Sequence, residues 1–340
     1  MVNRRLGPHT WAFRQPPHLA ATAAVVGPLE GEGPLRATFD RVRDDDLVGQ
    51  PSFELAESAL VRDSVELALH KAHVSFADVD LVAGGDLLNQ LVANHLAARH
   101  WPTAFLDLYG ACSTWAEGLA VTAALVDAGF ARRAVAVCSS HYGASERQYR
   151  YPVEHANQRR QTAQRTVTGA AAGVVGSEGP VRVTAATIGR VWDLGLKDPN
   201  DMGSAMAPAA ADTVLRHLSA TGTTVADYDR IITGDLARVG HPIFLHLLAE
   251  QGVVAAPVAD DCGILIYDPS QGVEAGGSGC ACSGTVVAGY VHQRLVRGDW
   301  RRVLVVATGA LHSPTTFQQG ESMPVVAHAV CLERDDGAGS

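Results

Sequence analysis

The feature that most constrains the fold of this chain is an internal repeat. The segment DVDLVAGGDL at residues 78–87 resembles DYDRIITGDL at residues 227–236. The segment GFARRAVAVCS at residues 129–139 resembles GDWRRVLVVAT at residues 298–308 in the same order. Segments that recur in order at a similar separation indicate a duplicated structural unit. We therefore expect two related halves.

Weaker matches between these anchors complete the repeat. Helices that begin with small residues are predicted over 110–128 and 279–297, and short apolar strands are predicted over 20–27 and 183–189 and over 168–178 and 325–335. The N-terminal half is then residues 1–179, which carries Cys112, and the C-terminal half is residues 180–340.

Each half alternates short, β-branched apolar runs with helices. This alternation predicts parallel strands joined by right-handed crossovers. Two such halves can pack as an α/β fold, a five-layered αβαβα sandwich with pseudo-twofold symmetry. Ligands of such sheets bind beyond the carboxyl ends of the strands. The loops expected to converge there are 84–90, 110–114, 233–242 and 275–284.

Composition and charge exclude several classes of protein. The formal net charge of −9 argues against a sequence-independent nucleic-acid binder, which needs basic surface. The sequence has no run of about 20 apolar residues, which a membrane-spanning helix would need. The N-terminus lacks the apolar core of a signal peptide. The spacing of the six cysteines fits no zinc site. We expect a protein of a reducing cytoplasm without a metal site or cofactor.

Cys112 follows an apolar run at 103–108 and precedes a predicted helix. Helix amides at this position are expected to lower the pKa of a thiol. Cys112 is therefore either an acyl-accepting nucleophile or a small core residue. The facing loops offer Asp235 and Ser278 but no His or Asn. Acyl transfer needs a base and an oxyanion hole near the thiol.

The segment SSHYGASERQYRYP at residues 139–152 begins at the expected ligand-binding end. Arginine forks bind carboxylates, and tyrosine faces stack on flat rings, so this composition suits a small planar dianion. A surface loop or a dimer contact is the alternative. RRQTAQR at 159–165 is interpreted as a solvated face. His241 and His312 either reach the pocket or are exposed.

The plan of two halves with Cys112 at a helix start resembles the thiolase superfamily, including the ketoacyl synthases. More closely, the chain resembles the stage V sporulation protein AD family of spore-forming bacteria. The stretches that carry this resemblance run almost from end to end. They include VGPLEGEGPL (26–35), AGGDLLNQ (83–90), YGACST (109–114), SSHYGASERQYRYP (139–152), DMGSAMAPAAADT (201–213), TGDLARVG (233–240), GGSGCACS (276–283) and VLVVATGALHSPT (303–315).

The resemblance implies a function that the residues alone do not. Proteins of this family are encoded with membrane proteins that move dipicolinic acid, as its calcium chelate, into the developing spore. The resemblance implies a dipicolinate-binding protein, peripherally associated with the spore or forespore inner membrane. It also implies membrane protein partners. The thiolase-like plan implies a homodimer through the edge near residues 103–108.

The chemistry of the thiolase superfamily carries over only in part. Cys112 matches the nucleophile, but Gly234 and Asp235 stand where the second-half loop has His or Asn. The glycine-rich segment 275–284 has neither the His nor the Asn of the superfamily's motif, and the segment after the last core strand lacks the second cysteine of the thiolases. We therefore expect a non-catalytic binding protein. The alternatives are a Cys112-dependent acyltransferase or condensing enzyme of the ketoacyl synthase type, and a scaffold with a vestigial pocket.

The candidate ligand-binding residues come from both halves and from the loop after the strand at 134–139. They are Cys112, Ser113, Asp86, Ser140, His141, Arg147, Asp235 and Ser278. No catalytic residue is expected, and Cys112 takes that role only in the acyltransferase alternative.

Overall fold

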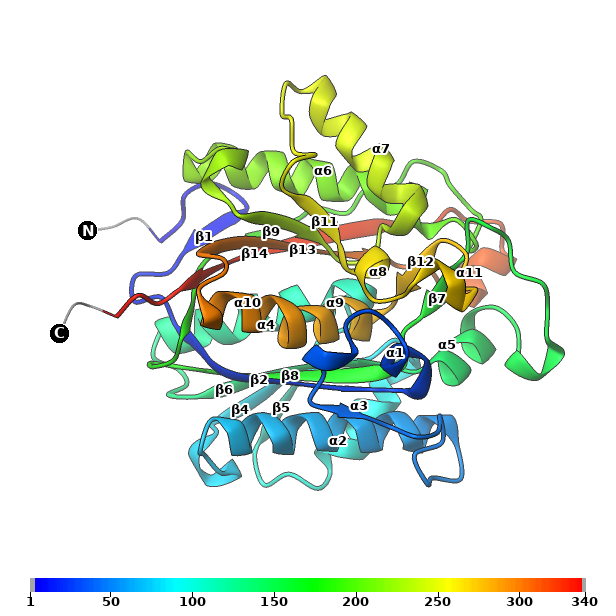
Figure 1. Cartoon of the computed structure of the whole chain (residues 1–340), viewed down its shortest axis with the longest axis horizontal. Coiled ribbons are helices and arrows are strands. Elements are labelled where there is room, and N and C mark those ends of the chain that lie inside the picture. The colour runs from blue at the N-terminus through cyan, green and yellow to red at the C-terminus, as the bar shows by residue number, and fades with distance from the viewer. Residues whose placement is uncertain (1–3, 338–340) are drawn as a thin grey trace.

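The computed structural model, which describes residues 4–337, has five layers in the order α, β, α, β, α (Figure 1). The outer helices of the first half are α2 (Phe53–Lys71) and α3 (Val92–Ala98). Those of the second half are α6 (Met202–Thr221) and α7 (Ala237–Glu250). The central layer holds α4 (Thr114–Asp127), α9 (Cys280–Val286) and α10 (His292–Arg297). The predicted five-layered sandwich is confirmed.

The two halves have the same strand order within one continuous sheet. In the first half it is β5-β4-β6-β8-β2, and in the second it is β11-β10-β13-β14-β9. The first set is β2 (His18–Val26), β4 (Leu81–Gly85), β5 (Ala104–Asp107), β6 (Ala134–Ser140) and β8 (Gly169–Gly176). The second set is β9 (Val181–Ile188), β10 (Arg230–Thr233), β11 (Ala259–Asp261), β13 (Arg302–Ala310) and β14 (Val325–Arg334). Each strand that the repeat predicts in one half is present, and so is its counterpart in the other half.

The prediction of parallel strands is wrong for the last strand of each half. β8 runs antiparallel to both β6 and β2, and β14 runs antiparallel to both β13 and β9. The chain leaves β6 and β13 at their carboxyl ends and passes through short elements that stay at that end. The next strand therefore starts where the previous one stopped and runs back.

The halves are joined along β2 and β9, which pair at His18↔Arg182 and Leu19↔Val181. The N-terminal strand β1 (Thr10–Ala12) crosses to the second half and pairs with β9, while β3 (Arg41–Val42) pairs with β2. The expected boundary between residues 179 and 180 falls in the turn between β8 and β9. That the halves are separate domains stays a prediction.

The central helices α4 and α9 are rich in apolar and small residues because both of their faces are covered by sheet. Trp115 and Leu119 of α4 are fully buried, as is every residue of α9. Small residues permit this close packing: a Cβ added at Gly284 would lie 2.4 Å from Cys138 Sγ. Burial of such side chains supplies the main free energy of folding.

Short elements gather at one end of the molecule, on the right of Figure 1. They are α5 (Tyr142–Tyr149), α11 (Pro314–Gln318), and the two-stranded sheet of β7 (Gln164–Thr166) and β12 (Gly276–Ser278). Helices α1 (Pro28–Gly31) and α8 (Cys262–Leu265) complete the α-helices of residues 4–337. α5 lies within the segment 139–152, which the sequence suggested to be a loop.

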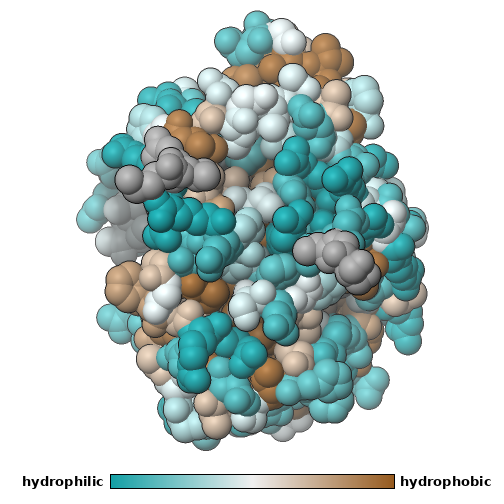
Figure 2. Space-filling view, turned by 90° about the vertical axis from the view of Figure 1, so that its left-hand side faces the viewer, coloured by the Kyte–Doolittle hydropathy of each residue, from teal (hydrophilic) through white to brown (hydrophobic). Residues whose placement is uncertain are grey.

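The described part of the chain, residues 4–337, begins and ends at the opposite end of the molecule, near β1 and the end of β14 (Figure 1). The surface there is mainly hydrophilic, and its hydrophobic residues are scattered (Figure 2). No helix within residues 4–337 is long and apolar enough to cross a membrane.

Candidate functional site

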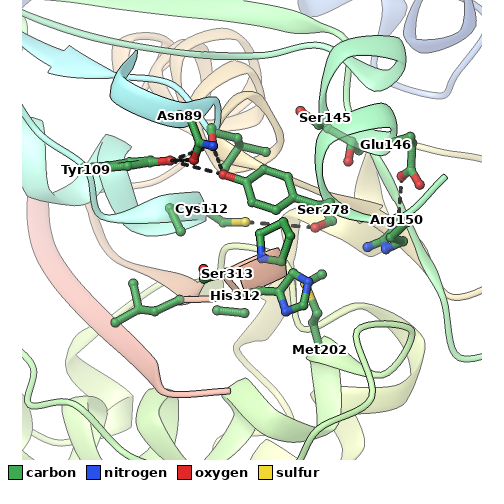
Figure 3. Close-up of a pocket in the computed structure, with 17 residues that line it drawn as sticks. Asn89, Tyr109, Cys112, Ser145, Glu146, Arg150, Met202, Ser278, His312 and Ser313 are labelled. Carbon is green, nitrogen blue, oxygen red and sulfur yellow. Dashed lines mark hydrogen bonds and ion pairs between the residues drawn. The ribbon is translucent and has the colours of Figure 1, made fainter. Parts of the chain in front are cut away.

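A pocket of about 340 Å³ lies at the carboxyl ends of the strands, between α5 and the segment before α11 (Figure 3). Both halves contribute to its wall. The first half supplies Leu87, Asn89, Tyr109, Ala111, Cys112, Ser145, Glu146, Tyr149, Arg150 and Thr166. The second half supplies Met202, Ser278 and residues 310–314, which include His312 and Ser313.

Three of the four loops expected to converge line this pocket: 84–90, 110–114 and 275–284. The fourth, 233–242, lies behind the wall, where the Asp235 carboxylate accepts hydrogen bonds from Ser278 Oγ and Gly279 N–H, both at 3.2 Å. The repeat therefore predicted the place of the pocket.

Cys112 and Ser278 meet at the seam between the halves. Cys112 lies in a 3₁₀ turn, Ala111–Ser113, directly before α4, and its Sγ is 4.0 Å from Ser278 Oγ. Asp235, which accepts the hydrogen bond from Ser278, also accepts a hydrogen bond of 2.6 Å from Thr308 Oγ1. Cys112, Ser278 and Asp235 thus form one buried network.

The electrostatics at Cys112 differ from the expectation. Burial raises the pKa of the thiol well above its usual value, and the neighbouring Asp235 carboxylate raises it further. Burial also raises the pKa of Asp235, to about 6, against the opposing hydrogen bond from Thr308. The predicted lowering by helix amides is therefore wrong, because desolvation and a nearby anion oppose the thiolate. At neutral pH the thiol is protonated.

Helix α5 decides which charged side chains reach the pocket. Its N-cap is His141, whose Nδ1 accepts a hydrogen bond from Gly143 N–H at 3.1 Å. Ser145, Glu146 and Tyr149 face the pocket, with the helical spacing of one face. Arg147 instead forms an ion pair with Glu54 of α2, outside the lining.

Arg150 is the arginine of the pocket wall. Its Nη1 donates a hydrogen bond of 2.7 Å to Glu146 Oε1, and both side chains are more than nine-tenths buried. Its Nε has no hydrogen-bond partner. Glu146 also has a second cation, Arg159, at 3.4 Å. Figure 3 shows the Glu146–Arg150 pair at one side of the pocket.

Flat rings form much of the remaining wall. The hydroxyl groups of Tyr109 and Tyr149 lie 3.2 Å apart, and both donate to the Leu87 carbonyl. The ring of Tyr149 is 6.0 Å from that of His312, tilted by 55°. Burial lowers the pKa of His312, so its ring is neutral at pH 7.

Several predicted residues have internal partners and lie outside the lining. Ser113 Oγ donates to the Gly110 carbonyl at 2.7 Å, and Ser140 Oγ donates to the Val167 carbonyl at 2.7 Å. His141 Nε2 pairs with the Asp46 carbonyl at 2.7 Å. The carboxylate of Asp86 accepts from the N–H groups of Leu88 and Asn94 and so holds the loop that carries Leu87. Of the proposed ligand-binding residues, Cys112 and Ser278 line the pocket.

Sequence reasoning left out Asn89, Tyr109 and Glu146, and it placed Arg147 rather than Arg150 among the ligand-binding residues. The i, i+4 spacing of Glu146 and Arg150 was the available signal for this pair. Of the two histidines, His312 lines the pocket and His241 does not. Among residues 4–337 no group of three or more His, Cys, Asp or Glu side chains is arranged to hold a metal ion.

The model of the stage V sporulation protein AD family, SpoVAD, matches residues 7–333. The chain belongs to the SpoVAD family. The stage V sporulation protein AD of Bacillus subtilis (strain 168) is 49% identical over 333 residues, which cover 98% of each chain. The protein is therefore a sporulation protein, as the resemblance predicted.

Solved structures show how this SpoVAD fold compares with others. OleA from Xanthomonas campestris is 16% identical, with a TM-score of 0.61 over 98% of this chain and 100% of its own. The 3-oxoacyl-[acyl-carrier-protein] synthase III from Aquifex aeolicus is 14% identical, with a TM-score of 0.56 over 93% of this chain and 99% of its own. At this identity the similarity shows the thiolase-like fold alone.

Proposed function

We propose that this protein binds dipicolinic acid in the pocket beside Cys112, without chemical change, and assists its transport into the developing spore. The observation that carries the proposal is a buried guanidinium, Arg150, beside the rings of Tyr149 and His312. Dipicolinate is a flat pyridine ring with two carboxylates. Its carboxylates suit an arginine fork, and its ring suits an aromatic wall.

The size and charge of the pocket support the proposal. Its volume of about 340 Å³ lies at the lower end of the range of about 300–1,000 Å³ for small-molecule sites. The lining has one guanidinium and one carboxylate, Arg150 and Glu146, so it is neutral overall. A neutral calcium chelate would fit this balance, and its calcium would come with the ligand. The free dianion would instead need Arg150 to leave Glu146.

Calorimetry with dipicolinate tests the proposal, with calcium and without it. Isophthalate, which lacks the ring nitrogen, and terephthalate, which has its carboxylates opposite each other, are the controls. We expect saturable binding of dipicolinate and binding of terephthalate at least about tenfold weaker, since terephthalate cannot keep both carboxylates in place and one lost charged contact has this effect. Isophthalate, which cannot chelate calcium through a ring nitrogen, should bind more weakly than dipicolinate when calcium is present. No heat with dipicolinate under either condition would overturn the proposal.

The second candidate is a Cys112-dependent acyltransferase or condensing enzyme. Two observations favour it: the fold is shared with 3-oxoacyl synthases, and Cys112 lines the pocket. Against it, burial and the Asp235 carboxylate both raise the pKa of the thiol. A protonated thiol is a poor nucleophile, so binding without turnover is the better-supported function.

We also propose a homodimer through β5 and contact with membrane protein partners at the spore or forespore inner membrane. β5 is an edge strand of its sheet, and Leu106 on it is 41% exposed. An unpaired apolar edge favours pairing with another strand, and a second copy of β5 would extend the sheet. The membrane partners rest on the family resemblance.

A further inference from the structure

A second cavity, of about 490 Å³, lies beside the pocket. We call it the outer cavity, and it is formed by Tyr142, Glu146, Arg150, residues 151–153, residues 156–160 and Asn200. The pocket and the outer cavity share Glu146 and Arg150. These two buried side chains, which pair at 2.7 Å, therefore form a common wall.

The outer cavity is rich in positive charge. Its lining holds Arg150, Arg159 and Arg160 against one carboxylate, Glu146. Behind the lining, Glu274 lies 3.6 Å from Arg159 Nε, and Asp198 pairs with Arg160. Asp198 offsets Arg160 only in part, because Arg160 is 68% exposed and its ion pair is screened by water. A concave surface with more cations than anions concentrates small anions.

Of the arginines of 159–165, Arg160 lies on a solvated face as the sequence suggested, but Arg159 and Arg165 do not. Arg159 and Arg165 flank the ring of Tyr142, with guanidinium carbons 5.6 Å and 3.7 Å from its centre. Arg159 Nη1 also donates to Tyr142 Oη at 3.1 Å. Arg159 is therefore held rigidly in the wall of the outer cavity.

The contacts of Glu146 allow the shared wall to exchange partners. Glu146 lies between two cations, with Arg150 at 2.7 Å and Arg159 at 3.4 Å. If Arg150 turns to a ligand carboxylate, Glu146 keeps Arg159 as its counter-ion. No buried charge is then left unpaired, which is the step that would otherwise be most costly.

From this arrangement we propose that the outer cavity is a second binding site, for a small carboxylate or similar oxyanion, through which the ligand reaches the pocket. The anion docks first on Arg159 and Arg160, and Arg150 then leaves Glu146 to receive it. The route into the pocket rests on the proposed function, which identifies the transported ligand as dipicolinate. The anion site in the outer cavity does not depend on the proposed function.

Two experiments test the outer cavity. The first is a crystal of the full chain soaked in selenate, with the anion located by anomalous scattering of selenium. We expect a selenium peak within hydrogen-bond distance of Arg159 or Arg160. Absence of a peak in the outer cavity, at a concentration that occupies other surface arginines, would overturn the anion site even if dipicolinate binds in the pocket.

The second experiment is stopped-flow binding of dipicolinate to Arg160→Gln. The matched control is Arg132→Gln, which removes the same charge from an exposed site paired with Asp80. We expect the association rate constant to fall at least about fivefold in Arg160→Gln at low salt, with an unchanged dissociation rate constant, since rim charges act on association. The control should change by less than about twofold. Equal association rates in the two variants would overturn the route.

These outcomes separate the two proposals. If the wild-type protein does not bind dipicolinate but selenate occupies the outer cavity, the proposed function fails and the anion site stands. If dipicolinate binds and Arg160→Gln associates like the control, the proposed function stands and the route fails.

Discussion

Cys112 Sγ lies 4.0 Å from Ser278 Oγ, and the two residues come from opposite halves of the repeat. Behind Ser278, Asp235 accepts its hydroxyl hydrogen at 3.2 Å. Cys112 thus faces a carboxylate, which opposes formation of the thiolate.

Cys112 should not become acylated. Incubation with acetyl- or malonyl-coenzyme A, followed by intact mass, is expected to leave the mass of the protein unchanged. Because the thiol pKa is raised, alkylation by iodoacetamide at neutral pH should be at least about tenfold slower than that of free cysteine. Cys112→Ser is the control. An acyl adduct present in the wild type and absent from Cys112→Ser would establish the acyltransferase alternative.

Arg150 should matter for dipicolinate binding, and Arg147 should not. Arg150→Gln removes the guanidinium of the pocket wall, and a charged hydrogen bond contributes about 1.5–3 kcal/mol, so we expect affinity to fall about 10- to 100-fold. Arg147→Gln, which removes an ion pair outside the lining, should change it by less than about twofold. Thermal unfolding of both variants checks that they fold. Equal losses of affinity would contradict the assignment.

The raised pKa of Asp235 predicts a pH effect on stability. The folded value is about 6 and the unfolded value about 3.9, so the folded state binds more protons between these pH values. Its free energy of unfolding therefore falls as pH rises from about 4 to 6, by about 3 kcal/mol for the whole shift. The Asp235→Asn variant has no titrating group at this position, so it lacks this pH-dependent loss of stability. The other buried carboxyl groups are common to both proteins.

Urea unfolding from about pH 4 to 7 measures this difference. We expect Asp235→Asn to gain stability relative to the wild type as pH rises through the window. Asparagine can keep the contacts to Gly279 N–H and Thr308 Oγ1. Parallel pH profiles for the two proteins would show that the Asp235 carboxyl group is not perturbed.

The β5 edge predicts a dimer that a charge should weaken. Leu106→Lys places an ammonium group on the exposed edge, and lysine on an edge opposes strand pairing. Light scattering coupled to size exclusion should show a dimer for the wild type and a monomer for this variant. Phe130→Lys, at a site 82% exposed in the turn between α4 and β6, is the control. A wild-type monomer at micromolar concentration would contradict the dimer.

The fold could be predicted from the sequence because short segments of the first half recur in the second half in the same order. The GDL and Arg-Arg anchors mark corresponding strands, and their order fixes which loops meet. The direction of β8 and β14 was not predicted, because an apolar strand looks the same in either direction. Only the path of α5 and α11, which stay at one end, reverses these strands.

The site was predicted less well than the fold. Its place and two of its lining residues, Cys112 and Ser278, follow from the repeat. The choice between Arg147 and Arg150 depends on the rotation of α5, which a loop interpretation of 139–152 cannot supply. The pKa of Cys112 depends on burial and on Asp235, and both come from tertiary packing.

The central claim is that the pocket beside Cys112 holds dipicolinate, and a crystal structure of the protein soaked with dipicolinate and calcium tests it most directly. The account predicts density for a flat ring against the wall formed by Tyr149 and His312, with a carboxylate on Arg150 and no covalent bond to Cys112 Sγ. Ordered dipicolinate elsewhere on the protein, with this pocket empty, would contradict it.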